Sequence, residues 1–284
     1  MTTANNTLQK AGSFSDRLHT MLRADLLRLR KTPHFFVLLL TAFAMPVLIL
    51  VMTTMVGGAD PQAGSAMPMF RNTWQIIASD SASSMNAMRA IDGITGGTGA
   101  SDAAGMMDMT AMMNSNLMYF LAAVFICLFI AEDFRSGYCK NLFTVRAQKT
   151  DYVASKTVVG FLAGTSFLLA FLFGACVGGA ASGLSFSLGA GGVGGLLLCI
   201  LAKVGLMAVF AAIFVLMSVI GKGRTWMSVL LSLFSGMLLF MMIPMMSPLD
   251  ATIVHAGMCL AGGAVFAAGV GAVSNLVLKT GSLA

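Results

Sequence analysis

The sequence predicts an all-α, polytopic membrane protein with six transmembrane helices, and its composition carries that prediction. Of its 284 residues, 57% are hydrophobic and 10% are charged, whereas a soluble domain has about 45–50% apolar and about 25% charged residues. The net charge of +6 is too small for a chain kept disordered by its charge, or for a nucleic-acid binder with a broad basic face. The class that remains is a multi-span membrane protein.

Six apolar runs are long enough to span a bilayer, which requires about 20 residues to cross about 30 Å of hydrocarbon. They lie at about 34–56, 112–131, 157–181, 193–220, 225–246 and 253–278. The first run exceeds the 7–15 apolar residues of a signal peptide, so we expect it to be a permanent span. An even number of spans places both termini on one side.

The distribution of Lys and Arg predicts which side that is. Fourteen of these residues fall in the amino-terminal segment, the 132–156 loop, the 221–224 turn and the tail, and only Arg71 and Arg89 fall on the opposite face. Because cations near span ends are retained in the cytoplasm, both termini are expected to be cytoplasmic. The five cysteines lie in spans or, for Cys139, in a cytoplasmic loop, so no disulfide is expected.

Residues 1–33 form a predicted cytoplasmic tail and amphipathic helix. Apolar residues recur there at spacings of three and four, while most of the arginines face elsewhere, and Pro33 interrupts the helix before the first span. The pattern favours an elbow helix that lies along the inner leaflet and then turns into the bilayer. The alternative is a basic flank that only sets the orientation. The apolar stripe consists of Leu18, Met21, Leu22, Leu26 and Leu29.

The extracellular loop at 57–111 is rich in Gly, Ser, Ala and Met and has too few core-forming residues for an enzyme domain. One or two short helices are expected, with an apolar stripe against the lipid surface made of Phe70, Trp74, Ile77, Met88 and Ile91. A methionine cluster follows. It has two interpretations, a Cu(I) site of thioether ligands or a flexible apolar cap on the second span. Its members are Met106, Met107, Met109, Met112, Met113 and Met118.

Small residues at four-residue spacing predict close helix contacts within the spans. The pairs are Gly160 with Gly164 and Gly174 with Gly178, and the last span carries a stripe of Gly257, Ala261, Ala264 and Ala268. Two interpretations stay open. The stripes pack against other helices of the same chain, or one of them contacts a second copy of the subunit.

No catalytic or nucleotide-binding constellation is found. The metalloprotease, nucleophile-elbow and phosphate-loop motifs are absent from the sequence. The nearest phosphate-loop candidate, Gly221-Lys222-Gly223, lacks the upstream glycine and a Ser or Thr directly after the lysine. We therefore expect no catalytic residues, no metal site, no bound cofactor and no ATP hydrolysis by this chain alone.

The loop at 132–156 carries a family resemblance. The second span ends on an acidic residue, a glycine follows five residues later, and the third span is entered through two lysines that flank a tyrosine. This pattern resembles that of the ABC-2 type transporter permeases. The residues that match are Glu132, Gly137, Lys149, Tyr152 and Lys156. Basic elbow, six spans and cytoplasmic termini also resemble that family, and the resemblance implies a partner chain that binds ATP and Mg.

A membrane subunit driven by a separate ATPase needs a short, stiff element between two spans, and the 132–156 loop is the candidate. Gly137 permits a turn, apolar anchors insert into a groove of the partner, and cations at the rim steer the contact. The alternative is a solvated basic loop that only obeys the orientation rule. The proposed coupling residues are Gly137, Tyr138, Lys140, Leu142, Phe143 and Arg146.

An acidic pair at the end of the second span and a lysine inside the fourth span each have more than one interpretation. Glu132 and Asp133 either pair locally with Arg135 or dock against the basic elbow helix. Lys203 lies about ten residues, or about 15 Å, inside the fourth span. Since an intramembrane cation costs about 2.5–3.5 kcal/mol or more, Lys203 is expected to face the bundle interior or a wet cavity. Two interpretations of Lys203 stay open. It marks a translocation path, or it forms a structural pair or partly snorkels toward the membrane surface.

The leading hypothesis is the permease subunit of an ATP-binding cassette exporter in a bacterial cell membrane. It moves a hydrophobic or amphipathic cargo such as a peptide, lipid or drug, and its partners are an ATPase subunit and a second, identical or different, membrane subunit. The alternatives are a secondary transporter and a non-transporting scaffold or immunity protein. A secondary transporter is disfavoured because the spans carry no carboxylate in their interior and the sequence shows no internal repeat.

Overall fold

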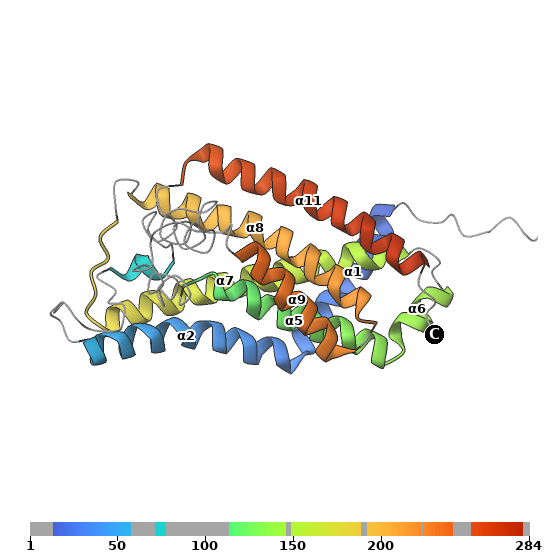
Figure 1. Cartoon of the computed structure of the whole chain (residues 1–284), viewed down its shortest axis with the longest axis horizontal. Helices are drawn as coiled ribbons and strands as arrows, with labels where there is room; N and C mark the ends of the chain where they lie inside the picture. Colours follow the sequence, from blue (N-terminus) through green and yellow to red (C-terminus); the bar gives the residue numbers. More distant parts are fainter. Residues whose placement is uncertain are drawn as a thin grey trace, which may run out of the picture.

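The structure is a bundle of long antiparallel helices (Figure 1). It is a computed structural model that describes residues 14–57, 72–77, 114–145, 149–188, 192–222, 224–240 and 251–280, and over these residues the predicted all-helical class is confirmed. Among the described residues, five helices are long and apolar enough to cross a membrane. They are α2 (Pro33–Gly57), α5 (Leu117–Arg135), α7 (Lys149–Ala181), α8 (Gly192–Ile220) and α11 (Ile253–Thr280).

The described helix of the fifth predicted span, at 225–246, is shorter than that apolar run. Helix α9 (Thr225–Phe240) has 16 residues, which at 1.5 Å per residue rise about 24 Å, short of the about 30 Å of a hydrocarbon core. Residues 241–246, which would complete that span, lie outside the described residues. Six spans therefore stay a prediction.

Two helices continue beyond their apolar runs at the same end of the bundle. Helix α5 extends to Arg135, past the predicted span end at 131, and α7 begins at Lys149 rather than at 157. Between them lies the short helix α6 (Tyr138–Val145). What the sequence presents as a polar loop is thus largely helical, and its helices place several charged side chains side by side.

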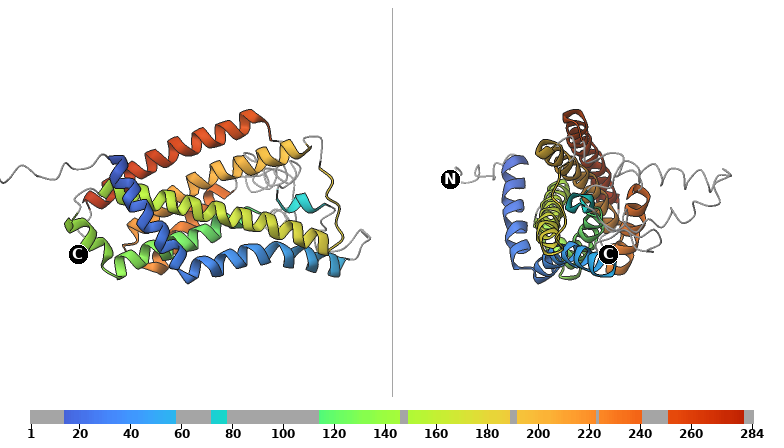
Figure 2. Two further views of the ribbon diagram at one scale, coloured as in Figure 1. Left: turned by 180° about the vertical axis from the view of Figure 1, so that it is seen from behind. Right: turned by 90° about the vertical axis from the view of Figure 1, so that its left-hand side faces the viewer.

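Helix α1 (Phe14–Lys31) packs along this end of the bundle, chiefly against α7. Its buried residues Met21, Asp25 and Leu29 are spaced four apart on one face, while Arg23 and Arg30 are exposed and Arg17 and Arg28 are half-buried. Figure 2 shows α1 crossing the ends of the other helices. That α1 rests on a membrane leaflet stays a prediction. The last turns of α11 lie at the same end (Figure 1), so the two ends of the described chain are on one side.

Helix α7 is the centre of the bundle and contacts α1, α2, α5, α8 and α11. Its small residues permit this crowding. A side chain on Gly174 would overlap the carbonyl oxygen of Phe43, and one on Gly178 would meet the backbone of Val47 in α2. The intrachain interpretation is thereby confirmed for this pair.

The other two groups of small residues behave differently from each other. Gly160 lies against Ile126 of α5, and Gly164 lies against Met207 of α8, so this pair also packs within the chain. On α11, Gly257 has no neighbouring atom in the space of a Cβ, and the alanines of that stripe are exposed. Contact of the α11 stripe with a second copy stays a prediction.

The described part of the 57–111 segment is a short 3-10 helix, η1 (Thr73–Ile76). Ile76 and Ile77 are buried, and the indole Nε1 of Trp74 donates to the carbonyl of Phe186, 3.1 Å away. Here the expected stripe against the lipid surface is wrong for Ile77, because Ile77 packs into the protein. Phe70, Met88 and Ile91 lie outside the described residues, as does the methionine cluster except for Met118, which is buried in α5.

Candidate functional site

A sharp turn joins α5 to α6. The chain leaves α5 through Ser136, whose amide donates to the carbonyl of Glu132 at 2.9 Å, and then passes Gly137 at φ +72°. A residue with a Cβ is strained at this φ, so glycine suits the position. The turn predicted at Gly137 is present, and it directs α6 back over the start of α7.

Four charged residues from three helices meet beneath this turn. Lys156 of α7 places its Nζ 2.8 Å from Oδ1 of Asp25 and 2.7 Å from Oδ2 of Asp133. Arg28 of α1 places Nη2 2.6 Å from Oδ1 of Asp133. Two cations and two carboxylates balance, which lowers the cost of removing them from water. We call Asp25, Arg28, Asp133 and Lys156 the ion network.

The ion network is buried. The side chains of Asp25, Asp133 and Lys156 are fully inaccessible, while that of Arg28 keeps 32% of its surface exposed. In such surroundings water cannot replace a lost partner. Removing one charge from a buried pair therefore costs about 3–5 kcal/mol.

Hydroxyl groups and aromatic rings complete the ion network. Ser155 donates to Oδ2 of Asp25 at 2.6 Å, and the hydroxyl of Tyr152 donates to Oδ2 of Asp133 at 3.0 Å. The ring of Phe129 lies 4.3 Å from Nζ of Lys156, and Tyr138 of α6 lies 4.5 Å from Cζ of Arg28. The electron-rich faces of these rings attract the two cations electrostatically. Through Tyr138, α6 is also attached to α1.

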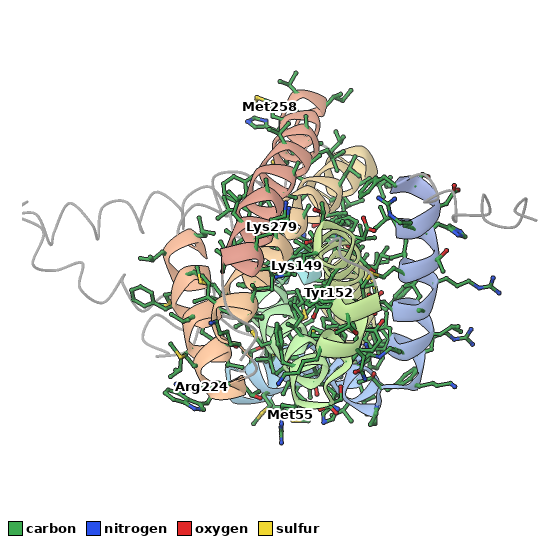
Figure 3. The ribbon with its side chains drawn as sticks, turned by 90° about the vertical axis from the view of Figure 1, so that its right-hand side faces the viewer. Met55, Lys149, Tyr152, Arg224, Met258 and Lys279 are labelled. Carbon is green, nitrogen blue, oxygen red and sulfur yellow. The ribbon has the colours of Figure 1, made fainter. Side chains whose placement is uncertain are left out.

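Two more polar contacts fasten the start of α7. Nε of Arg17 in α1 lies 2.9 Å from Oδ2 of Asp151. The ammonium of Lys149 donates to the carbonyl of Leu278 in α11 at 2.6 Å. In Figure 3, which looks onto this end of the bundle, Lys149 and Tyr152 lie near the middle, between α11 and α1. The first turns of α7 thus connect α1 to α11.

The apolar side of α6 faces the protein. Phe143 packs edge-on against Tyr152 with ring centroids 5.5 Å apart, and Leu142 is half-buried in the same core. Lys140 is exposed on the outer side, together with Asn141 and Thr144. Arg146 lies outside the described residues. The proposed anchors are therefore partly used within the chain, and a partner would meet the outer side of α6 first.

Cys139 in α6 is buried. Burial raises the pKa of its thiol to about 11, because the thiolate would lose its hydration. The thiolate is the reactive form, so Cys139 is expected to be inert toward thiol reagents near neutral pH.

Lys203 lies in the middle of the bundle, at a distance from the ion network. It is 3% exposed, and its Nζ donates to Oδ1 of Asn116 at 2.8 Å. The hydroxyl of Tyr119 donates to the carbonyl of Lys203 at 3.0 Å, and the ring of Tyr119 stacks on Phe210. The expectation that Lys203 faces the interior rather than lipid is confirmed. Within the described ranges, no group of three His, Cys, Asp or Glu side chains lies close enough to hold a metal ion.

The structure brings together Tyr138, Tyr152 and Lys156 from the predicted set, while Glu132 and Lys140 are exposed at the rim. Of the two interpretations of the acidic pair, docking to the elbow helix is confirmed for Asp133, which bonds Arg28 rather than Arg135. Asp25 is the member that sequence reasoning missed. A signal for it exists, because Asp25 stands four residues from both Met21 and Leu29 on the apolar stripe.

Comparison with known proteins yields one finding. A model of the ABC-2 family of transporter proteins matches residues 72–239, more than half of the chain. The match takes in η1, α5, α6, α7, α8 and α9, and it includes the turn at Gly137 together with Asp133, Lys156 and Lys203. No match was found among curated proteins or among solved structures.

Proposed function

The chain belongs to the ABC-2 family of transporter proteins, and we propose that it is the permease of an exporter whose ATP is hydrolysed by a separate subunit. Its cargo is a hydrophobic or amphipathic molecule such as a peptide, lipid or drug. A second membrane subunit, identical or different, completes the path across the cell membrane.

The observation that carries this proposal is the ion network beneath α6. A separate ATPase acts on the permease only if its motion reaches the spans, and α6 is a helix exposed at the bundle end between α5 and α7. Asp133 lies near the end of α5, and Lys156 lies in the second turn of α7. A push on α6 therefore moves α5 and α7 together, since both are joined to α6 by the chain and to each other by the ion network.

The elbow helix moves with this unit. Asp25 and Arg28 attach α1 to α7 and α5, and Arg17 attaches it to Asp151. Helix α1 continues through Thr32 directly into α2, which packs against α7 in turn. The proposed motion is a rigid-body displacement of α1, α2, α5 and α7 against α8, α9 and α11. This displacement breaks the hydrogen bond from Lys149 to the carbonyl of Leu278 in α11.

Lys203 supports a path within the bundle. It belongs to α8, contacts the start of α5 through Asn116, and so lies between helices that the proposed motion displaces. A buried ammonium next to amide and hydroxyl groups suits the polar part of an amphipathic cargo. The apolar walls around Lys203, including Leu168, Phe171 and Ile200, suit its apolar part.

The orientation of the chain is tested with single cysteines at opposite ends. Asn141→Cys on α6 is expected to resist an impermeant maleimide in intact cells and to react after the membrane is opened, because the cation distribution places α6 in the cytoplasm. Thr252→Cys, exposed before α11, is expected to react in intact cells. Native Cys139 is unsuitable as a reporter, since it is buried and protonated. Labelling of Asn141→Cys from outside contradicts the orientation.

The coupling role of α6 is tested by copurification. Tagged chain expressed in its source cells is expected to bring down a chain that carries a phosphate-loop motif and hydrolyses ATP. The surface pair Lys140→Glu with Thr144→Arg is expected to reduce this copurification about tenfold or more, because it reverses one charge and adds a bulky charged side chain on the side of α6 that a partner meets first. Leu142→Asp with Phe143→Asp is expected to do the same, and it also disturbs packing on Tyr152.

The matched control is Lys279→Glu, a charge reversal at the same end on α11 (Figure 3). It is expected to leave copurification within about twofold of wild type, because a rim charge outside the contact has little effect. Unchanged recovery of the ATPase with both α6 variants would remove α6 from the coupling role.

A further inference from the structure

A cavity opens beside the ion network, on the other side of Arg28 and Phe129. It has a volume of about 640 Å³ and lies where the α1–α2 corner, the end of α5 and the start of α9 meet. This volume lies within the about 300–1,000 Å³ of small-molecule sites. The ion network does not occupy this cavity: Arg28 lines it, but the other three members, Asp25, Asp133 and Lys156, do not.

The polar part of the cavity is basic. Arg28, Lys31 and Arg135 contribute to its lining, and Glu132 is the acidic residue there. Arg28 is committed to Asp133, but Lys31 and Arg135 form no ion pair with any residue that the structure describes. The exposed ammonium of Lys31 and the exposed guanidinium of Arg135 thus face the same cavity, and its lining has an excess of positive charge. The chemistry they recognise is that of an anion, and guanidinium suits phosphate best.

The remaining wall of the cavity is apolar. Phe125, Leu128 and Phe129 of α5 line it, and Pro33, which also lines it, begins the first membrane-crossing helix. The cavity therefore lies where headgroups of a bilayer give way to acyl chains. An occupant with a phosphate at one end and a hydrocarbon chain at the other satisfies both walls.

We propose that this cavity binds the phosphate of an anionic membrane lipid, with Lys31 and Arg135 on the phosphate and the acyl chain along Phe125 and Leu128. Basic pockets between spans at a cytoplasmic face bind anionic headgroups in this way, and each cation near the surface contributes about 1 kcal/mol. That energy corresponds to about a fivefold change in affinity for each cation. The site does not depend on the ATPase or on the cargo.

The test uses the purified full-length chain in neutral detergent, with bound lipid counted by native mass spectrometry and stability followed by thermal unfolding. Phosphatidylglycerol is expected to bind saturably and to raise the unfolding temperature. In Lys31→Gln with Arg135→Gln, its dissociation constant is expected to rise about 25-fold, from two cations at about fivefold each. Glu132→Gln, which removes the opposing charge, is expected to lower it.

Two variants separate a built site from surface charge. Arg23→Gln with Arg30→Gln removes two exposed cations of α1 that do not line the cavity, and it is expected to leave phosphatidylglycerol binding unchanged. Lys31→Arg with Arg135→Lys keeps both charges and is expected to retain binding. An equal loss in the two glutamine double variants overturns the proposal.

Three ligands separate the sources of the phosphate. Phosphatidylcholine with the same acyl chains, and inorganic phosphate or glycerol phosphate at equal concentration, are expected to bind at least about tenfold more weakly than phosphatidylglycerol. Phosphatidylcholine carries a choline cation that cancels its phosphate charge and repels Lys31 and Arg135, and the two soluble phosphates lack acyl chains. If phosphatidylcholine stabilises the protein equally, the cavity does not select the net negative charge of the lipid and the proposal of an anionic-lipid site is wrong. If inorganic phosphate does so, the occupant is a soluble anion and the lipid is excluded.

Discussion

Lys156→Met is expected to lower the free energy of unfolding by about 3–5 kcal/mol, the cost of leaving a buried charge without its partner. Lys156 lies within 2.8 Å of both Asp25 and Asp133, and all three side chains are fully buried. Without the ammonium, two buried carboxylates share Arg28, which bonds Asp133 at 2.6 Å but lies 3.7 Å from Asp25. Methionine keeps the length and apolar contacts of the lysine stem, so the loss reports the charge. Denaturant unfolding of the purified chain in mixed micelles measures it.

A second substitution makes this prediction specific. Asp25→Asn in the Lys156→Met background restores charge balance, leaving the Arg28–Asp133 pair, and is expected to regain at least about 1 kcal/mol, since contacting residues of one network do not add independently. Lys140→Met, which removes an exposed lysine of α6, is expected to change stability by less than about 0.5 kcal/mol. Equal stability of Lys156→Met and wild type would show that the ion network does not hold α1 to α5 and α7.

Lys203→Leu is expected to assemble normally and to export poorly. Leucine relieves the cost of a buried ammonium while leaving Asn116 without its 2.8 Å donor, and these effects oppose each other in stability. The export step loses a charged donor to the cargo, worth about 1.5–3 kcal/mol, which is at least about a tenfold loss of rate. The measurement is efflux of fluorescent amphipathic peptides and dyes that cells with the wild-type chain export.

Two controls accompany the Lys203 prediction. Lys203→Arg keeps a cation and is expected to retain most of the efflux. Recovery of the assembled complex, followed by size-exclusion chromatography, reports folding separately from transport. Normal efflux by Lys203→Leu ends the proposed path through Lys203, and failure of Lys203→Leu to assemble assigns the residue to a structural pair with Asn116.

Two predicted spans coincide with observed helices to within one residue at each end. The runs at 34–56 and 193–220 correspond to α2 (Pro33–Gly57) and α8 (Gly192–Ile220). Helix α7 departs from its run because most of its first eight residues are polar. They remain helical and buried in part because Asp151, Tyr152 and Lys156 find partners on other helices. A hydropathy pattern does not reveal helical residues that are held by polar partners on other helices.

The ion network was only partly predictable. The acidic residues after the second span had two candidate partners, Arg135 at close sequence distance and the elbow helix far from it. The structure favours the distant pairing, and Arg135 faces the cavity with Lys31 instead. Asp25 and Lys156 are 131 residues apart. Such pairings depend on how α1 crosses α7, which periodicity within either helix does not reveal, although an acid on an apolar stripe indicates that it has a buried partner.

In the proposed mechanism, α1, α5, α6 and the start of α7 move as one unit when the ATPase acts on α6. Spin labels at Arg23→Cys on α1 and Asn141→Cys on α6, both exposed, measure this directly in the ATPase-bound complex, in a background whose native cysteines are replaced. The distance between the two labels is expected to stay constant to within about 2 Å between the nucleotide-free and ATP-bound states. In Lys156→Met this distance is expected to change between the two states. A shift of several ångströms between nucleotide states with the wild-type network would show that α1 and α6 do not move as one unit.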